Sequence, residues 1–264
     1  MIYCRFSTSA GPQYGMVETV AGDEQITHIL PRVEGGVPDA AGGQKIPAIP
    51  LASAPLLAPV QPSQIICSGR NYLEWGIVAQ FLKVAEPLIF MKPPSSIIAH
   101  GETILRPRIS QQVEFGGELA VVIAKRCSNL RDDEDVRGYI AGYTIANDVT
   151  ARDLEESDDP GTRARSFDTF CPVGPVVHDG LDPWRGVPLE SRVNGKQRQL
   201  ADTVDFIFPL DVLLRYISRR MTMNRGDLVL TGAPAGGGPV VAGDVVEVTI
   251  GGLGTLRNPV ADAP

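Results

Sequence analysis

Acidic side chains interrupt apolar segments in the middle of the chain. Glu114 and Glu118 lie within residues 113–125, VEFGGELAVVIAK, and Asp148 ends the apolar segment GYIAGYTIANDV. Side chains on a β-strand alternate between its faces, so Glu114, Gly116 and Glu118 are expected on one face. An unpaired charge beside the run LAVVIA would cost roughly several kcal/mol, so Glu118 needs a cation, a proton or a basic partner.

Two roles suit these carboxylates. A magnesium ion is often held by one or two protein carboxylates, with substrate oxygens and water completing its octahedron, so Glu118 and Asp148 would suffice. Alternatively, each acid caps a turn or pairs with Arg152 or Arg165. The spacing alone does not separate the two hypotheses.

A lysine and a glycine-rich turn add groups that stabilise negative charge. Lys92 ends the apolar segment PLIFMK and precedes two prolines, a placement that suits a cation aimed into a pocket; the alternative is a surface lysine on an edge strand. The turn LVLTGAPAGGG, residues 228–238, offers backbone amides to a carboxylate or enolate oxygen, although a plain flexible turn has the same composition. It matches no nucleotide-binding pattern.

The composition limits the kinds of partner. The 264 residues carry 24 Lys and Arg against 31 Asp and Glu, so no general positive field attracts nucleic acid or an anionic membrane. The longest apolar run is far shorter than the roughly 20 residues needed to cross a bilayer, and no signal-peptide pattern opens the chain. We therefore expect a cytoplasmic protein. Its four cysteines lack metal-ligand spacing and are predicted to be reduced, buried thiols.

The scaffold that positions these groups is predicted to be rich in short strands, because 28 Gly and 22 Pro favour turns over long helices. Helices are expected at residues 73–86 and 209–221, where apolar residues recur at helical spacing, and after Thr150 as N-cap. Strands are expected at residues 64–69, 87–92, 113–125, 138–149, 172–177, 189–195, 227–232 and 244–250.

These elements indicate an α+β, mainly β fold class, an antiparallel or mixed β-roll or barrel with helices at its margins. Residues 1–60 alternate short apolar segments with Gly and Pro clusters and are predicted to form a small N-terminal β-rich domain. Residues 41–64 are expected to be an extended, Pro-rich connection. Residues 61–264 then form the main domain.

From about residue 62 onward the chain resembles the fumarylacetoacetate hydrolase family. Six segments in the same order carry the resemblance: CSGRNY, PLIFMKPPSSIIAHGETI, VEFGGELAVVIAK, GYTIANDVTARDL, RSFDTFCPVGP and LVLTGAPAGGG. The resemblance implies a mixed β-roll catalytic domain, usually a homodimer, that binds Mg²⁺ or Mn²⁺. It also implies a small carboxylic acid substrate, a 2-oxo or 1,3-diketo acid, and C–C hydrolysis, decarboxylation or isomerisation.

The resemblance also assigns site residues. Glu118 and Asp148 match metal-binding carboxylates of the family, and Lys92 matches its active-site lysine. The loop that opens the family's lid corresponds to Arg70, Asn71 and Tyr72. The predicted catalytic residues are therefore Lys92, Arg70, Tyr72, Trp75 and Arg165, and the predicted substrate-binding residues are Asn71, Arg152, Asp153, Glu155, Thr231, Gly232 and Ala233.

The chain departs from the family pattern at the site itself. Gly116 stands where the family has another metal-binding Glu. Glu114 is about 6.6 Å further along the strand, so it replaces that ligand only with a shifted metal or a bridging water, and Mg²⁺ or Mn²⁺ binding is expected to be weak or absent. Trp75 and Val78 stand where hydrolytic members have the His and Glu that activate water. Glu155 stands where many members have Gln, Arg165 stands where a Lys is usual, and Ala233 stands where the glycine-rich turn usually reads G-T-P.

These departures favour a changed reaction over ordinary hydrolysis. The leading hypothesis is enolate-stabilising decarboxylation, isomerisation or cyclisation of a 2-oxo or β-keto acid, which needs no activated water. A Trp75 facing the pocket would suit a bulky substrate, as in secondary metabolism. The alternatives are a C–C hydrolase in which Glu74 or Glu155 is the relocated base, and a non-catalytic member acting as a binding or structural subunit.

Overall fold

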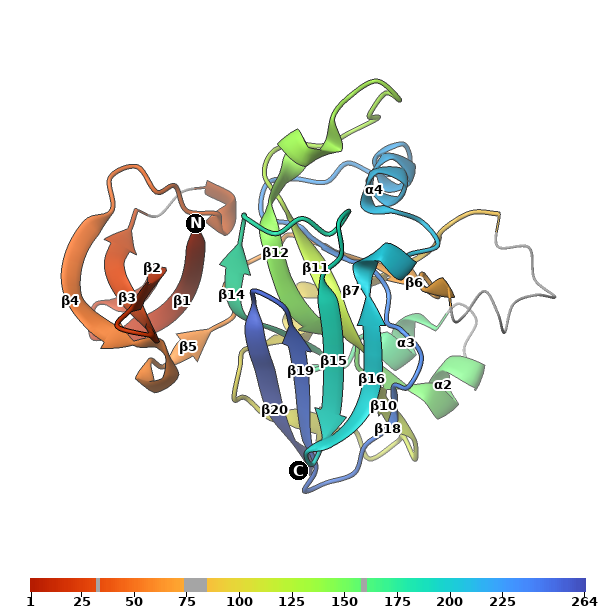
Figure 1. Ribbon diagram of the computed structural model, residues 1–264. Coiled ribbons are helices and arrows are strands. Elements are labelled where there is room, and N and C mark those ends of the chain that lie inside the picture. The colour runs from red at the N-terminus through yellow and green to blue at the C-terminus, as the bar shows by residue number, and fades with distance from the viewer. Residues whose placement is uncertain (32–33, 74–84, 158–160) are drawn as a thin grey trace.

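The computed structural model describes the chain except for residues 32–33, 74–84 and 158–160 (Figure 1). Its described part is mainly β, as the composition predicted. The first strands curl together at one side of the molecule (Figure 1). They are β1 (Ile2–Thr8), β2 (Gly11–Val20), β3 (Asp23–Leu30), β4 (Gln44–Pro50) and β5 (Leu56–Leu57).

The N-terminal strands continue into the sheet of the main body. That sheet has the order β4-β3-β2-β1-β14-β12-β11-β17-β6-β7, with β5 pairing β1 and β8 pairing β14. Its further members are β6 (Ile65–Gly69), β7 (Leu88–Lys92), β8 (Ile97–Ile98), β11 (Gly117–Ile123), β12 (Ile140–Asn147), β14 (Cys171–His178) and β17 (Leu228–Leu230). Strands β12, β17 and β6 run in one direction and β11 runs in the opposite direction, so the segments that follow β12, β17 and β6 meet beside the start of β11.

Two smaller sheets complete the roll. One has the order β16-β15-β19-β20-β9, and the other has the order β13-β10-β18. Their members are β9 (Ile104–Arg106), β10 (Val113–Phe115), β13 (Thr150–Ala151), β15 (Pro188–Val193), β16 (Lys196–Asp202), β18 (Gly238–Pro239), β19 (Val245–Ile250) and β20 (Gly254–Asp262). The mixed β-roll expected from the sequence is thereby confirmed.

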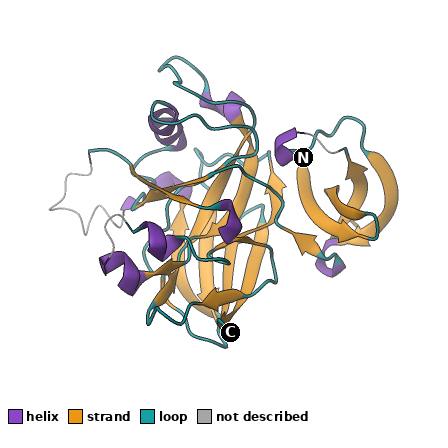
Figure 2. Cartoon of the chain, turned by 180° about the vertical axis from the view of Figure 1, so that it is seen from behind, coloured by secondary structure: helices purple, strands orange, loops and turns teal. Residues whose placement is uncertain are grey.

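The described helices are short and lie at the margin of the strands (Figure 2). The α-helices are α2 (Arg152–Ser157), α3 (Thr162–Arg165) and α4 (Leu210–Ser218). The 3₁₀ helices are η1 (Glu34–Gly36), η2 (Leu51–Ser53), η3 (Pro94–Ser96), η4 (Val136–Tyr139) and η5 (Thr203–Asp205). Helix α4 confirms the helix expected at 209–221, and the helix expected at 73–86 lies almost wholly outside the described residues. Within the described part, none of the helices has the length and apolar character that a bilayer crossing requires.

The apolar core explains why the central strands keep their register. All seven residues of β11 are buried, and Leu213, Leu214 and Ile217 of α4 pack into the same core. A one-residue slip of β11 would move its whole hydrophobic set to the opposite face. The four cysteines are buried and unpaired, as predicted.

Three local expectations were wrong. Residues 44–50 and 56–57 are strands of the N-terminal unit, so much of the Pro-rich connection is built into a sheet. The chain also leaves one sheet and enters another at Gly116, so β10 and β11 are separate strands. Thr150 lies in β13, and its buried hydroxyl makes no hydrogen bond to α2 or to any other described residue, so it does not cap α2. The predicted division into domains at residue 60 stays a prediction.

A buried aspartate joins the start of β6 to the start of β17. Asp227 Oδ1 accepts hydrogen bonds from the backbone N and the hydroxyl of Ser63, at 3.0 and 2.7 Å. Its Oδ2 accepts from Gln64 Nε2 at 2.8 Å and from Asn224 N at 2.6 Å. These bonds hold β6 and β17 side by side in parallel. Residues at the end of β6 and after β17 line the cavity described below.

We predict that Asp227→Ala lowers the free energy of unfolding by at least about 3 kcal/mol, because the donors of Ser63, Gln64 and Asn224 around this buried carboxylate lose their acceptor. Urea unfolding followed by circular dichroism measures the loss. Asp133→Ala is the control, since Asp133 is 76% exposed and its removal should change stability by less than about 0.5 kcal/mol. Equal losses in the two variants would contradict the structural role of Asp227.

Candidate active site

A cavity of about 500 Å³ opens where β6, β7, β10 and β11 meet the segments after β12 and β17. The structure brings many of the predicted site residues into its wall: Arg70, Glu114, Gly116, Glu118, Asp148, Arg152, Glu155, Arg165 and Ala233. The cavity is large enough for a small carboxylic acid and its walls carry both signs of charge.

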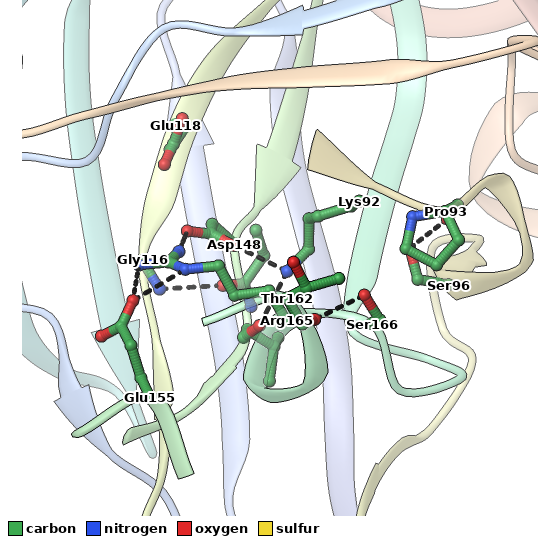
Figure 3. A network of polar contacts seen from close by, with 12 residues as sticks. Lys92, Pro93, Ser96, Gly116, Glu118, Asp148, Glu155, Thr162, Arg165 and Ser166 are labelled. Carbon is green, nitrogen blue, oxygen red and sulfur yellow. Dashed lines mark hydrogen bonds and ion pairs between the residues drawn. The ribbon is translucent and has the colours of Figure 1, made fainter. Parts of the chain in front are cut away.

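Asp148 is the most strongly paired carboxylate of the cavity. It directly follows β12, and its backbone N donates to Gly116 O at 2.8 Å. Its Oδ1 accepts a hydrogen bond from Lys92 Nζ at 2.7 Å, and its Oδ2 accepts one from Arg165 Nη1. Figure 3 shows Asp148 between these two cations. Both carboxylate oxygens are therefore engaged by the protein.

Lys92 lies behind Asp148 rather than on the wall of the cavity. Its side chain is 0% exposed, and Nζ donates a second hydrogen bond to Val149 O at 2.8 Å. Lys92 is therefore not a surface lysine, and it does not reach the cavity directly. The geometry makes Lys92 a positioning residue that holds Asp148 and the backbone after β12.

Arg165 connects two carboxylates across the wall. Its Nε and Nη2 donate to Glu155 Oε1 at 2.9 and 2.6 Å, while Nη1 donates to Asp148. The guanidinium carbon also lies 4.0 Å from the centre of the Phe90 ring. Stacking and forked hydrogen bonds suit a guanidinium and hold it in one orientation.

A second arginine extends the same network toward β10. Arg152 Nε donates to Glu114 Oε2 at 2.9 Å, and Nη1 donates to Glu155 Oε2. Glu114 Oε1 accepts from Gln112 Nε2 at 2.6 Å. Both oxygens of Glu114 are thus occupied, and so are both oxygens of Glu155.

Glu118 differs from these acids because it has no ion pair with any described residue. Its Oε2 accepts a hydrogen bond from Gly232 N at 2.7 Å, and its carboxylate stands apart from the Asp148–Arg165 network in Figure 3. Burial, followed by the negative charge of Asp148, raises the pKa of Glu118 well above its ordinary value. For Asp148, burial acts in the same direction, but the charges of Arg165 and Lys92 outweigh it and lower the pKa.

The loop after β6 contributes a cation, Arg70, to the cavity. Arg70 lines the cavity with a positive φ of 53°, a strained conformation that occurs often at functional sites. No described carboxylate pairs with it. Asn71 instead supports the loop from behind, with Nδ2 donating to Thr231 O at 2.8 Å. Tyr72 is buried against Phe206, 4.9 Å between ring centres.

The glycine-rich turn after β17 is partly structural. Thr231 is buried and its hydroxyl donates to Leu119 O at 2.8 Å. The backbone N–H of Gly232 donates a hydrogen bond to Glu118, and Ala233 lines the cavity. Asp153 lies outside the cavity wall and accepts hydrogen bonds from Ser110 Oγ and Gln111 N, at 2.6 and 2.8 Å. Trp75 and Glu74 lie outside the described residues.

Several wall residues were missed by the sequence analysis. Ser68 and Thr150 line the cavity with buried hydroxyls that find no hydrogen-bond partner among the described residues. Phe90, which was also missed, supports Arg165. Gly236, Gly237 and Gly238 line the cavity as part of the glycine-rich turn that the sequence did indicate. Ser68 and Phe90 lie within the predicted strands at 64–69 and 87–92, and only this position in the chain could have pointed to them.

The donors present do not fit a divalent cation. Asp148 and Glu114 have both oxygens hydrogen-bonded by the protein, and Gly116 supplies no side chain. The described residues contain no group of three His, Cys, Asp or Glu arranged to hold a metal. Glu118 alone remains, which is fewer ligands than a dedicated site offers.

Charge in this region is already balanced. Three carboxylates are paired with three cationic groups: Glu114, Asp148 and Glu155 with Lys92, Arg152 and Arg165. Glu118, whose burial raises its pKa well above the ordinary value, stands outside this balance. Neutrality without a metal removes the electrostatic demand that buried acids would otherwise place on a cation.

Comparison with known proteins connects this site to a family. The family model described as Fumarylacetoacetate (FAA) hydrolase C-terminal matches residues 64–261. Among curated proteins, the mitochondrial oxaloacetate tautomerase fahd2 of Xenopus laevis is 39% identical over 217 residues, which cover 78% of this chain and 68% of that protein.

Solved structures agree with that match. A 2-hydroxyhepta-2,4-diene-1,7-dioate isomerase from Mycobacterium marinum has a TM-score of 0.87 and 37% identity, covering 99% of this chain and 98% of that one. A maleylpyruvate hydrolase from Sphingobium sp. SYK-6, in complex with manganese(II) and pyruvate, has a TM-score of 0.78 and 26% identity, with 100% of both chains covered.

We predict opposite effects of removing the two central charges. The folded-state pKa of Glu118 is raised, so its contribution to stability is full below the unfolded value of about 4.3 and is lost as pH rises through the folded value. Glu118→Gln should therefore exceed the wild type at pH 8 by about 1 kcal/mol or more. Guanidinium chloride unfolding at pH 4 to 8 measures the difference, which should shrink toward pH 4.

Asp148→Asn is the matched comparison. The folded-state pKa of Asp148 is lowered, so its contribution is present above the unfolded value of about 3.9 and is lost as pH falls through the folded value. At pH 7 the variant should lose about 3 kcal/mol, because Lys92 and Arg165 keep buried charges without their partner. A gain in stability for Asp148→Asn would refute this account of the ion pairs.

Proposed function

The chain belongs to the fumarylacetoacetate hydrolase family, and from that membership we propose that it is an enzyme that isomerises an enolisable 2-oxo or β-keto carboxylic acid. The observation that carries the proposal is the contrast among the wall acids: Glu118 has no ion pair among the described residues, and it faces a cavity in which Arg165 is fixed. The tautomerase and isomerase names of similar proteins support the same class of reaction.

The proposed step is a proton transfer between carbon and oxygen. Glu118 takes the proton from the carbon next to the 2-oxo group, and the bonding electrons move onto the carbonyl oxygen. Arg165 stabilises the enolate oxygen, because a fixed cation in a partly buried site needs no reorganisation as the charge develops. Glu118 then returns the proton to that oxygen, which gives the enol.

Substrate binding is assigned to Arg70 and Arg152. Arg70 lines the cavity without a carboxylate partner among the described residues, so a substrate carboxylate is its natural partner. Arg152 lies between Glu114 and Glu155 and adds positive charge on the side of β10. No step requires Mg²⁺ or Mn²⁺, although manganese is present in the similar hydrolase. Homodimer formation stays a prediction.

Hydrolysis is less favoured by this arrangement. Glu155, one of the two candidate bases for a relocated water, has both oxygens hydrogen-bonded to Arg152 and Arg165. Taking a proton from water would break two charged hydrogen bonds of this carboxylate. Decarboxylation and cyclisation share the enolate and differ in the substrate they require.

We predict that the wild type exchanges the C3 protons of oxaloacetate with deuterium and converts its enol to the keto form. Glu118→Gln should lower both rates by at least about 100-fold, because the group that moves the proton is lost. Proton NMR in D₂O and ultraviolet absorbance follow the two events. Release of carboxylic acid products from acetylpyruvate at a comparable rate would instead support a hydrolase, and no turnover of any substrate would support a non-catalytic protein.

Arg70→Met tests the carboxylate-binding role. We expect KM to rise at least about tenfold with a smaller change in kcat, because loss of one charged hydrogen bond weakens substrate binding by about 1.5 to 3 kcal/mol. The control is Arg108→Met, which removes the same charge from an exposed residue outside the cavity wall. A fall in kcat with KM unchanged would assign Arg70 a different role.

A further inference from the structure

We infer that the Arg165 guanidinium takes the place of a divalent cation beside Glu118 and Asp148, so that the protein binds an anionic, enolate-like ligand without metal. The inference rests on the proposed function for the kind of ligand. It goes beyond that function because it makes ligand binding independent of Mg²⁺ and Mn²⁺, with the guanidinium in the place of the metal.

The position of the absent third carboxylate is filled. A Cβ added to Gly116 would lie 3.0 Å from Cβ of Ala233 and 3.6 Å from Asp148 O. The first distance is tighter than ordinary van der Waals contact, so a side chain at 116 would require the turn after β17 to move by a few tenths of an ångström. In the present packing of Gly116 against Ala233, a further ligand from this position is not accommodated without that shift.

Asp148 is committed to the two cations. Metal coordination through Oδ2 would have to displace Arg165, and coordination through Oδ1 would have to displace Lys92, whose ammonium is 0% exposed. Leaving a buried ammonium without its partner costs several kcal/mol, because the charge stays away from water with nothing to compensate it. Among the described residues, no other carboxylate forms an ion pair with Lys92.

Arg165 is held as a rigid ligand for an anion. Its side chain is 14% exposed, and three of its five N–H groups make the hydrogen bonds to Asp148 and Glu155. Two N–H groups remain, on a guanidinium that lines the cavity and stacks on Phe90. A planar fork of this kind matches the paired oxygens of a carboxylate or an enolised 2-oxo acid.

Two binding measurements on the full chain test the inference. The first adds the protein to Mn²⁺ and follows the electron paramagnetic resonance of the free ion, which should not decrease at protein concentrations up to about 100 µM. The second titrates oxalate, a planar dianion, by calorimetry in EDTA and in Mn²⁺. The two oxalate affinities should agree within about threefold.

Variants at helix α3 supply the matched comparison. Arg165→Gln should weaken oxalate binding at least about 30-fold in EDTA, with no recovery in Mn²⁺, while Arg163→Gln on the same helix should bind as the wild type does. Arg165→Lys keeps the charge without the fork and should retain binding within about tenfold of the wild type. This variant keeps the test valid if Arg165→Gln does not fold.

Three results would overturn the inference: tight Mn²⁺ binding by the wild type, oxalate binding that requires Mn²⁺, or no oxalate binding in either buffer. None of these decides the proposed function, which fails instead when oxaloacetate shows neither proton exchange nor enol conversion. The two ideas are thus tested by separate measurements, one of binding and one of turnover.

Discussion

The carboxylate of Asp148, held between the ammonium of Lys92 and the guanidinium of Arg165, is the interaction on which the rest of the site depends. All three groups are largely buried, so each would be costly without the others. The arrangement is therefore nearly all-or-none, and it fixes the end of β7, the segment after β12 and helix α3 relative to one another. A cavity with stable walls follows from that constraint, even though the chain segments are distant in sequence.

The network also explains why Glu118 has a distinct character. Lys92 and Arg165 are already used by Asp148, and Arg165 is shared with Glu155, so no described cation forms an ion pair with Glu118. Its burial then favours the protonated form, and the Gly232 amide offsets this only in part. One carboxyl whose pKa is raised, beside another whose pKa is lowered, is the usual basis for dividing acid and base roles within one site. The proposed proton transfer uses the carboxyl of Glu118, and the burial that raises its pKa lowers the folding stability at neutral pH.

Sequence reasoning located the acids but not their partners. Glu118 and Asp148 were found because an acid at the end of an apolar strand is costly and so needs a reason, and strand alternation placed Glu118 on an inner face. The same reasoning treated residues 113–125 as one strand and missed the change of sheet at Gly116, because that change depends on pairing with β13 and β18, far along the chain. The pairing of Asp148 with Arg165 stood as an open alternative. The burial of Lys92 behind Asp148 was not foreseen, since a strand pattern does not state which face another segment covers.

The departures from the family pattern form one consistent electrostatic change. A guanidinium at 165 in place of the usual lysine supplies a fork that reaches Asp148 and Glu155 together, and a glutamate at 155 in place of the usual glutamine supplies the negative charge that this fork binds. Replacing a metal-binding glutamate by Gly116 removes one negative charge that would otherwise need a cation. The arginine at 165 keeps the positive charge, the glutamate at 155 adds one negative charge and the glycine at 116 removes one, so together the three changes leave the net charge of the site as it was. Random decay has no reason to conserve that balance, and so the set of changes favours a site remodelled for metal-independent binding of an anion.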